Sequence, residues 1–232
     1  MQVELPHRHK YQWRTAYVVK RLLLKTIGPN RTLKISLRIH WILRRMSFEL
    51  SGLVFGDKFQ NSALGLSEEL LSTLILPSDT VADLGCGTGR WSRACAMKAK
   101  KVFGIDANRL TLEEAKKLGG SVDYIELDLD TSLEKMPYVD LTLMIHFLEH
   151  IKNPLNLLKV VREKSKKIVI EVPDFESDPL NYSRIWTREP FYFDSDHICE
   201  FTLAELQLLL RKTDWSPSFI VQKGGTILIV AN

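Results

Sequence analysis

The feature that most constrains this fold is a glycine-rich turn between a buried strand and a helix. The strand is the apolar run Thr80–Leu84, and Gly85, Gly87 and Gly89 follow it before a helical segment that starts at Arg90. Glycines at such a turn let the backbone bend sharply and approach a ligand without a Cβ in the way. The spacing is GxGxG rather than the dinucleotide GxGxxG, because Arg90 occupies the third glycine position of that pattern. The turn therefore predicts a ligand-binding loop.

Short β-branched runs alternate with helical stretches along the rest of the chain, which indicates a parallel sheet with helices on both faces. The last two β runs are joined by Lys223-Gly224-Gly225 and predict an antiparallel hairpin. We therefore predict an α/β fold with a doubly wound, mostly parallel seven-stranded sheet and an antiparallel C-terminal hairpin. The predicted strands are 80–84, 101–105, 122–127, 138–145, 167–172, 218–222 and 226–231, and the predicted helices are 17–27, 33–46, 68–76, 90–98, 110–117, 154–164 and 203–212.

Acidic residues stand at the ends of the first three predicted strands. Asp83 closes the first strand, Asp106 follows the second, and Asp128 follows the third. A carboxylate about 20 residues after a glycine turn is where a ribose diol is bound. An acidic residue beside the turn suits a ligand with an ammonium group and would repel a pyrophosphate. Because the carboxyl ends of parallel strands share one edge of the sheet, the three residues predict a single binding rim.

With these elements the chain resembles the class I S-adenosylmethionine (SAM)-dependent methyltransferases. The matching pieces lie within about residues 64–231 and are VADLGCGTG, VFGID, YIELDLD, VDLTLMIHFLEHI and KIVIEVP. The resemblance implies a Rossmann-like methyltransferase fold, methyl transfer as the activity and SAM as the cofactor. It also implies that the glycines line the methionine moiety, that Asp83 helps to hold its amino end, and that Asp106 binds both ribose hydroxyls. The cofactor site assigned in this way comprises Asp83, Gly85, Cys86, Gly87, Gly89, Asp106, Ala107, Asp128, Leu129 and His146.

A narrower resemblance concerns the methyl acceptor. The stretches EVPDFESDP and FDSDHICEFTLAELQLLL look like a subgroup of these enzymes associated with glycan and polysaccharide modification. That subgroup often carries an Arg-rich helical lead-in comparable to RIHWILRRMSFEL. The resemblance implies O-methylation of a sugar, glycan or lipid-linked acceptor. The alternatives are a tRNA or RNA methyltransferase that uses the basic N-terminal segment, and a SAM-binding protein without catalysis.

A hydroxyl acceptor must lose a proton, and a positioned base typically accelerates such a step by about 10²–10⁴-fold. The densest polar cluster is formed by Asp194, Asp196, His197 and Glu200. We predict His197 as the base, oriented by Asp196 or Asp194, because a neighbouring carboxylate fixes the histidine tautomer. His150 is the other catalytic candidate. The structural alternatives are that His150 fixes a loop and that the cluster leads into the helix at 203–212.

A metal-dependent hydrolase is a competing interpretation. His146, Glu149 and His150 have the order HxxEH that some zinc peptidases use. A zinc hydrolase would leave the glycine turn and Asp106 unexplained, so no metal is assigned. A divalent ion held by the acidic cluster around His197 is the alternative.

The first 50 residues are strongly basic, with eleven Lys or Arg against two Glu and a net charge of +9, whereas the whole chain carries +4. Such a segment favours an anionic partner. The interpretations are a peripheral contact with an anionic membrane, binding of RNA phosphates, or a solvated face of two helices. We rank nucleic acid lower because no RNA-binding motif accompanies the charge. We divide the chain into a basic helical extension, 1–63, and a methyltransferase domain, 64–232, with an aromatic acceptor loop at about 174–196.

Composition and termini bear on the location. No run approaches the roughly 18 consecutive apolar residues that span a bilayer, and the polar start MQVELPHRHK does not fit a secretory signal. The three cysteines form no CxxC pair, which favours reduced thiols over a disulfide framework. We therefore expect a cytoplasmic protein, peripheral at the membrane if the basic segment binds lipid.

Overall fold

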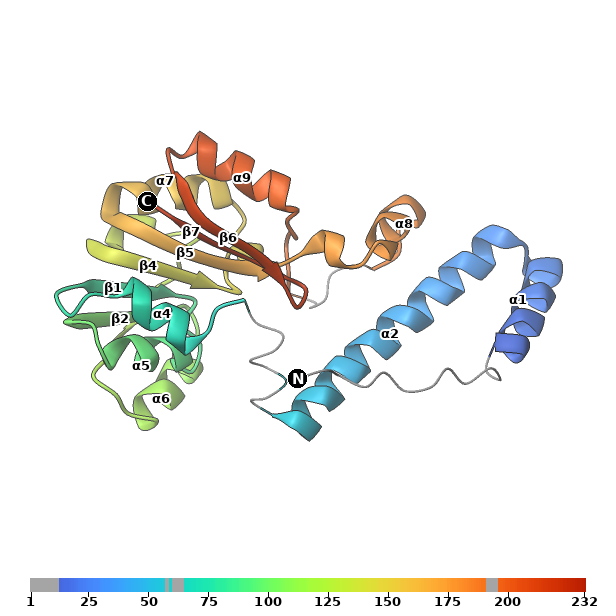
Figure 1. The fold of residues 1–232 in the computed structure, drawn as a ribbon, viewed down its shortest axis with the longest axis horizontal. Helices are drawn as coiled ribbons and strands as arrows, with labels where there is room; N and C mark the ends of the chain where they lie inside the picture. Colours follow the sequence, from blue (N-terminus) through green and yellow to red (C-terminus); the bar gives the residue numbers. More distant parts are fainter. Residues whose placement is uncertain (1–12, 57–58, 60–64, 191–195) are drawn as a thin grey trace. The chain divides into compact units, whose positions relative to one another are not determined.

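The computed structural model describes residues 13–56, 59, 65–190 and 196–232. The chain divides into two compact units (Figure 1). The helical unit comprises residues up to Leu50 together with Pro179–Phe191, and the sheet unit comprises Ser51–Asp178 and Tyr192–Asn232. The domain boundary expected at residues 63 and 64 lies outside the described residues.

The sheet unit is built on seven strands in the order β3-β2-β1-β4-β5-β7-β6. All neighbouring strands pair in parallel except β7, which runs antiparallel to both β5 and β6. The predicted doubly wound sheet with its C-terminal hairpin is therefore confirmed. The strands are β1 Thr80–Leu84, β2 Lys101–Asp106, β3 Asp123–Glu126, β4 Val139–Ile145, β5 Ser165–Pro173, β6 Pro217–Lys223 and β7 Thr226–Ala231.

Helices cover both faces of the sheet. Side chains of α7 and α9 pack in one apolar cluster with one face of the strands, and side chains of α4 and α5 pack in a second cluster with the other face. Central residues such as Leu143 and Val169 are fully buried, which explains why these strands are continuously apolar in sequence. The helices of this unit are α4 Glu68–Leu74, α5 Arg90–Ala96, α6 Arg109–Lys117, α7 Pro154–Lys164 and α9 Leu203–Lys212, with the 3-10 turns η1 Leu133–Lys135, η2 Leu148–His150 and η3 Phe175–Ser177.

Local sequence signals set the ends of these elements. Thr202 and Glu205 form a reciprocal capping box at the start of α9, as their spacing predicts. Asn153 caps α7, whose first residue is Pro154. The register aligns Leu84 with Ile105 and with Met144, so the loops that follow β1, β2 and β4 emerge at one edge of the sheet.

The helical unit contains α1 Trp13–Ile27, most of α2 Pro29–Phe55, and α8 Leu180–Thr187. Gly28, with a φ of 79°, separates the first two helices, and α2 extends well beyond the predicted 33–46. The expectation of a loop at 174–196 is wrong in part, because η3 and α8 lie within it. The short helix was missed because its buried face is polar: Asn181 and Arg184 are buried there, so no apolar periodicity marks it. Asp194, a predicted orienting residue, lies outside the described residues.

Candidate active site

The glycine turn folds back onto the neighbouring strand. The backbone N–H groups of Gly85 and Cys86 both donate to the carbonyl of Ile105, at 2.8 and 3.0 Å. Gly85 has a φ of 70°, and a Cβ at this position would run into the ring of Phe147. The turn therefore requires glycine both for its backbone conformation and for its close approach to the loop after β4. This leaves a cradle of bare backbone at the carboxyl end of β1.

Asp106 ties that cradle to the end of β2. Its carboxylate accepts hydrogen bonds from the backbone N–H of Gly87 at 2.9 Å and from that of Asn108 at 2.8 Å. The two bonds fix the carboxylate at the rim, and a carboxylate has acceptor positions beyond the two that they occupy. The arrangement fits the binding of a ribose diol, which the spacing from Asp83 predicts.

A cleft of about 360 Å³ opens beside the cradle. The register of the parallel strands explains why residues from four successive loops meet there. Of the predicted cofactor residues, six line it: Gly85, Asp106, Ala107, Asp128, Leu129 and His146. Two of the predicted catalytic residues, His150 and Asp196, line the same cleft.

The other predicted cofactor residues lie around or beneath the cleft. Asp83 is buried in β1 and accepts a hydrogen bond from the Ser92 hydroxyl at 2.6 Å. Burial, opposed by that hydrogen bond, raises the pKa of Asp83 to about 7. Cys86 is also buried, and burial raises the pKa of its thiol, so the thiol stays protonated. Gly87 and Gly89 both have positive φ, and a Cβ on Gly89 would collide with Tyr124. A direct role of Asp83 at the amino end of a ligand stays a prediction.

His146 is held between two buried carboxylates. Its Nδ1 lies 3.4 Å from Glu149 and its Nε2 lies 3.6 Å from Glu171. Burial alone would lower the pKa of His146, but the two carboxylates outweigh it and raise this pKa to about 9. The imidazole is therefore protonated at neutral pH and cannot accept a proton. His146 supplies a fixed positive charge on the wall of the cleft.

Glu149 and Glu171 were not among the predicted site residues, although both are fully buried beside the cleft. Glu171 accepts hydrogen bonds from the backbone N–H groups of Gly65 and Leu66, at 3.0 and 2.7 Å. A sequence signal was present for Glu171, because a lone carboxylate inside an apolar strand needs a buried partner.

The two histidines of the predicted catalytic set lie against each other. The rings of His150 and His197 meet edge to face, with centroids 4.8 Å apart. Asp196 approaches His150 rather than His197. Its backbone carbonyl lies 3.3 Å from the Nδ1 of His150, and its Oδ2 lies 3.5 Å from the same nitrogen. His197 is instead paired with Glu200, at 3.4 Å. The expected contact of Asp196 with His197 is therefore not seen, and the alternative orientation of His197 by Asp194 stays a prediction. The backbone N–H of Ile198 donates to the carbonyl of Glu149, and this bond draws the two segments together.

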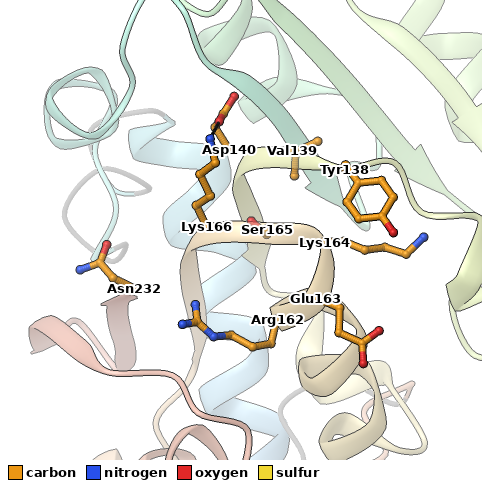
Figure 2. Close-up of a pocket in the computed structure, with 9 residues that line it drawn as sticks. All are labelled: Tyr138, Val139, Asp140, Arg162, Glu163, Lys164, Ser165, Lys166 and Asn232. Carbon is orange, nitrogen blue, oxygen red and sulfur yellow. Dashed lines mark hydrogen bonds and ion pairs between the residues drawn. The ribbon is translucent and has the colours of Figure 1, made fainter.

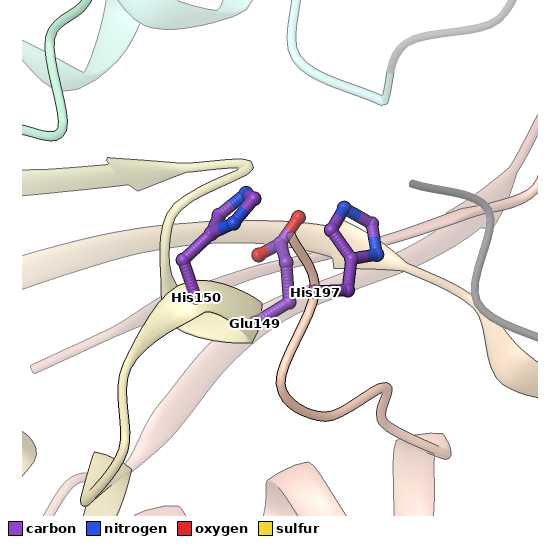
Figure 3. Close-up of side chains that lie close together, drawn as sticks. All are labelled: Glu149, His150 and His197. Carbon is purple, nitrogen blue, oxygen red and sulfur yellow. The ribbon is translucent and has the colours of Figure 1, made fainter. Parts of the chain in front are cut away.

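The side chain of Glu149 lies close to both rings (Figure 3). Ligand atoms of Glu149, His150 and His197 all lie within 4.8 Å of one another, so the three side chains could together hold a metal ion. Neither carboxylate oxygen of Glu149 has a hydrogen-bond partner among the described residues. The HxxEH pattern thus contributes only two members to this group, and the third comes from another loop.

A larger cavity, of about 720 Å³, lies at the opposite edge of the sheet (Figure 2). Its lining comes from the starts of β4 and β5, the end of α7 and the C-terminal Asn232. An ion pair of 2.7 Å between Lys166 and Asp140 occupies part of that lining. No predicted site residue lies there, and ligands of open α/β sheets bind at the carboxyl ends of the strands. We therefore assign the active site to the smaller cleft.

A family model described as a methyltransferase domain matches residues 58–217. The chain belongs to this family. The class that the sequence resemblance implies, a SAM-dependent methyltransferase, is thereby confirmed. The glycan-modifying subgroup gains no support from the comparisons.

Curated relatives match only part of the chain. Ubiquinone biosynthesis O-methyltransferases of Pseudomonas paraeruginosa and Nitrosomonas europaea are 33% and 32% identical to it over 89 residues. Each match covers 36% of this chain and 38% of the relative. The chain thus matches well under half the length of these relatives.

Solved structures share the fold at low sequence identity. A magnesium protoporphyrin IX methyltransferase from Synechocystis PCC 6803, with bound SAH (S-adenosylhomocysteine), has a TM-score of 0.55 and 16% identity, covering 70% of this chain and 77% of that one. A SAM-dependent methyltransferase from Methanosarcina mazei has a TM-score of 0.58 and 19% identity, covering 72% of this chain and 98% of that one. These likenesses support the methyltransferase fold.

Proposed function

We propose that this methyltransferase methylates a hydroxyl oxygen and that His150 is the base that accepts the hydroxyl proton. The single observation that carries the proposal is the position of His150. It lines the cleft that also contains Asp106 and Asp128, and Asp196 stands beside its Nδ1. The backbone carbonyl of Asp196 lies 3.3 Å from Nδ1, and with the carboxylate beside it this acceptor favours the tautomer that leaves Nε2 free to accept a proton.

His150 is a better candidate for the base than either neighbouring histidine. His146 is protonated at neutral pH because of Glu149 and Glu171. The side chain of His197 is 7% exposed and does not line the cleft. His197 would support the ring of His150 by edge-to-face contact, with Glu200 fixing His197 in turn.

Other residues of the cleft would bind the cofactor and orient the acceptor. SAM, when bound, supplies a methyl group that its sulfonium has already activated. The backbone cradle at Gly85 would receive the methionine end, Asp106 the ribose, and Asp128 with Leu129 the adenine. Orientation of the acceptor in the cleft can supply about 7–11 kcal/mol of the barrier reduction. The base at His150 adds about 10²–10⁴-fold.

The acceptor is a hydroxyl compound of the sugar, glycan or lipid-linked class. The names of the curated relatives, which are O-methyltransferases, favour an oxygen acceptor. The restriction to a glycan rests on the sequence resemblance alone. A tRNA acceptor and a SAM-binding protein without turnover are the alternatives that the experiment must separate.

The test measures methyl transfer from radiolabelled SAM into lipid, polysaccharide and RNA fractions with wild-type protein and three variants. His150→Gln should lose about 10²–10⁴-fold in turnover, with SAH affinity changed less than about 3-fold, because the base does not bind the cofactor. His197→Gln should lose less. Incorporation into RNA alone, or full activity of His150→Gln, would contradict the proposal.

Glu149→Gln and a chelator distinguish a base from a metal ligand. If His150 acts as a base, a chelator leaves activity unchanged and Glu149→Gln affects it only through His146. If the three clustered side chains hold a catalytic ion, the chelator and each of the three variants abolish activity together, and the role assigned to His150 is wrong.

A further inference from the structure

We propose that the helical unit binds the surface of an anionic lipid membrane through α1, α2 and α8. This goes beyond the methyl-transfer proposal, because it concerns a surface that contains none of the cleft residues. It rests on apolar side chains that stand exposed beside basic ones on helices whose interior is polar.

An exposed apolar stripe runs along α2. Ile35, Ile39, Ile42, Met46 and Leu50 follow one another at three- and four-residue intervals, which places them on one face of the helix. Each is between 41% and 54% exposed, and Leu43, four residues after Ile39 and 55% exposed, belongs to the same stripe. Exposed apolar patches of this extent on a soluble protein mark a binding surface.

Basic side chains adjoin this stripe. Arg31, Lys34 and Arg38 also recur at three- and four-residue intervals, on the neighbouring face of α2, and all three are exposed. The carboxylate of Glu189 pairs with Lys34 and Arg38. A single carboxylate between two cations leaves this face positively charged.

The first helix has the same composition. Tyr17, Val18 and Leu22 of α1 are between 60% and 67% exposed. Lys20 and Arg21 are exposed among them, and α1 contains no acidic residue. A helix that mixes exposed aliphatic and basic side chains in this way is typical of the interface between lipid headgroups and acyl chains.

The third helix adds aromatic side chains. Trp186 is 77% exposed, and its ring lies against that of Tyr182, with 6.2 Å between the centroids. Trp and Tyr prefer the headgroup level of a membrane because one end of each ring is apolar and the other polar. The chain continues from α8 through a few residues to Asp196 of the active site.

The exposed apolar side chains do not form the interior of the unit, because the described residues buried there are polar apart from Leu37 of α2. Arg184 is fully buried and donates to the side chain of Asn181 at 2.8 Å, and it also contacts His40. Glu189 is buried with Arg38 as its partner. These contacts hold α8 on α2 and leave the aliphatic side chains outside.

The positive charge and the apolar stripe together indicate which class of partner this surface binds. A second copy would bring two strongly basic surfaces together, which opposes association. RNA would be attracted by the charge, but the aliphatic stripe of α2 offers it neither stacking nor hydrogen bonds. An anionic membrane satisfies both features, with headgroups at the basic side chains and acyl chains at the stripe. Among the described helices none is long and apolar enough to cross a membrane, so the unit would lie on the surface.

The experiment is flotation of the full chain with vesicles of phosphatidylcholine, with or without phosphatidylglycerol. The expected result is binding that requires phosphatidylglycerol and weakens with salt. Lys20→Gln/Arg21→Gln/Lys25→Gln should weaken binding about 100-fold, since each basic residue near the surface contributes about a factor of five. Ile39→Gln/Leu43→Gln should weaken it at least about 10-fold, because two half-exposed aliphatic side chains lose their burial in lipid.

Matched variants on the sheet unit control for charge and polarity. Leu110→Gln/Leu118→Gln replaces aliphatic residues that are 74% and 60% exposed, and Lys116→Gln/Lys117→Gln removes charge from the same helix. Both should bind vesicles like the wild type. Equal losses in these controls would show that general charge or solubility, not the helical unit, governs binding.

Other outcomes overturn the proposal. These are no binding to phosphatidylglycerol vesicles, binding to tRNA without binding to vesicles, or a dimer that Ile39→Gln/Leu43→Gln dissociates. SAH affinity of every variant is measured in parallel. Retained SAH binding by variants that no longer float shows that they are folded and that the loss lies in the helical unit. SAH binding by the wild type without flotation would overturn this proposal and leave the proposed function untouched.

Discussion

The two units of this protein place apolar and polar residues in opposite ways. The sheet unit buries aliphatic residues such as Leu143 and Ile168 and places Asp106 and Asp128 at one rim. The helical unit buries Arg184 and Glu189 and exposes Ile39 and its neighbours. The first arrangement stabilises the fold that carries the cleft, whereas the second leaves apolar side chains exposed on the surface of the unit. Variants that compare the two units test this difference.

The largest stability effect is expected in the core of the sheet unit. Leu143→Ala removes a fully buried side chain from β4 and should cost about 2–5 kcal/mol of unfolding free energy. Leu43→Ala, at a site on α2 that is 55% exposed, should cost less than about 1 kcal/mol. Denaturant unfolding measures both. Similar losses would mean that the stripe on α2 is packed in solution.

A smaller and local effect is expected from the polar interior of the helical unit. Arg184→Ala removes the hydrogen bond from Arg184 to the side-chain oxygen of Asn181 and opens a cavity. The free energy of unfolding should fall by about 2–3 kcal/mol. Hydrogen exchange should rise in α2 and α8 and stay unchanged in the strands. Arg31→Ala, an exposed change on α2, serves as the control. Faster exchange throughout the sheet would contradict the independence of the two units.

The charge of His146 should make stability depend on pH. Its folded pKa of about 9 lies above the ordinary value of 6.5, so its stabilisation is complete below about pH 6.5 and is lost as the pH rises through 9. Because the side chain is 37% exposed, the contribution is discounted to about 1–2 kcal/mol. The difference in unfolding free energy between wild type and His146→Gln should therefore shrink from pH 6 to pH 9. A constant difference would show that Glu149 and Glu171 do not keep the imidazole charged.

The smallest effect is expected at the surface of the sheet unit. Arg109 and Glu113 form an exposed pair at 3.1 Å, one helical turn apart. Arg109→Ala should change the unfolding free energy by less than about 0.5 kcal/mol, since exposed pairs contribute little. A loss above 1 kcal/mol would indicate a role for this side chain beyond the ion pair.

The elements of the sheet unit could be predicted well from the sequence, because its apolar runs, helix caps and turn residues indicate the same element boundaries. The strand 80–84 and the helices 154–164 and 203–212 have the predicted bounds, since apolar runs and caps mark the same positions. The rim acids were found through their spacing, because parallel strands bring consecutive loops to one edge.

The rest depends on contacts between distant positions. The position of Asp196 beside His150 depends on the hydrogen bond between the N–H of Ile198 and the carbonyl of Glu149. No local sequence pattern predicts this contact between distant segments. The contacts of His146 with Glu149 and Glu171 likewise depend on tertiary structure, because Glu149 lies in η2 after β4 and Glu171 lies in β5. The helix α8 has a polar buried face, so periodicity could not show it.

We assign the rim of β1, β2 and β3 as the SAM site. The most direct test is isothermal titration of the purified protein with SAH, alongside Asp106→Ala and the control Asp123→Ala. Asp123 lies at the far end of β3 and is 62% exposed. We expect micromolar binding by the wild type and by Asp123→Ala, and at least about 100-fold weaker binding by Asp106→Ala, because two charged hydrogen bonds are lost. Absent binding by the wild type, or undiminished binding by Asp106→Ala, would contradict the account.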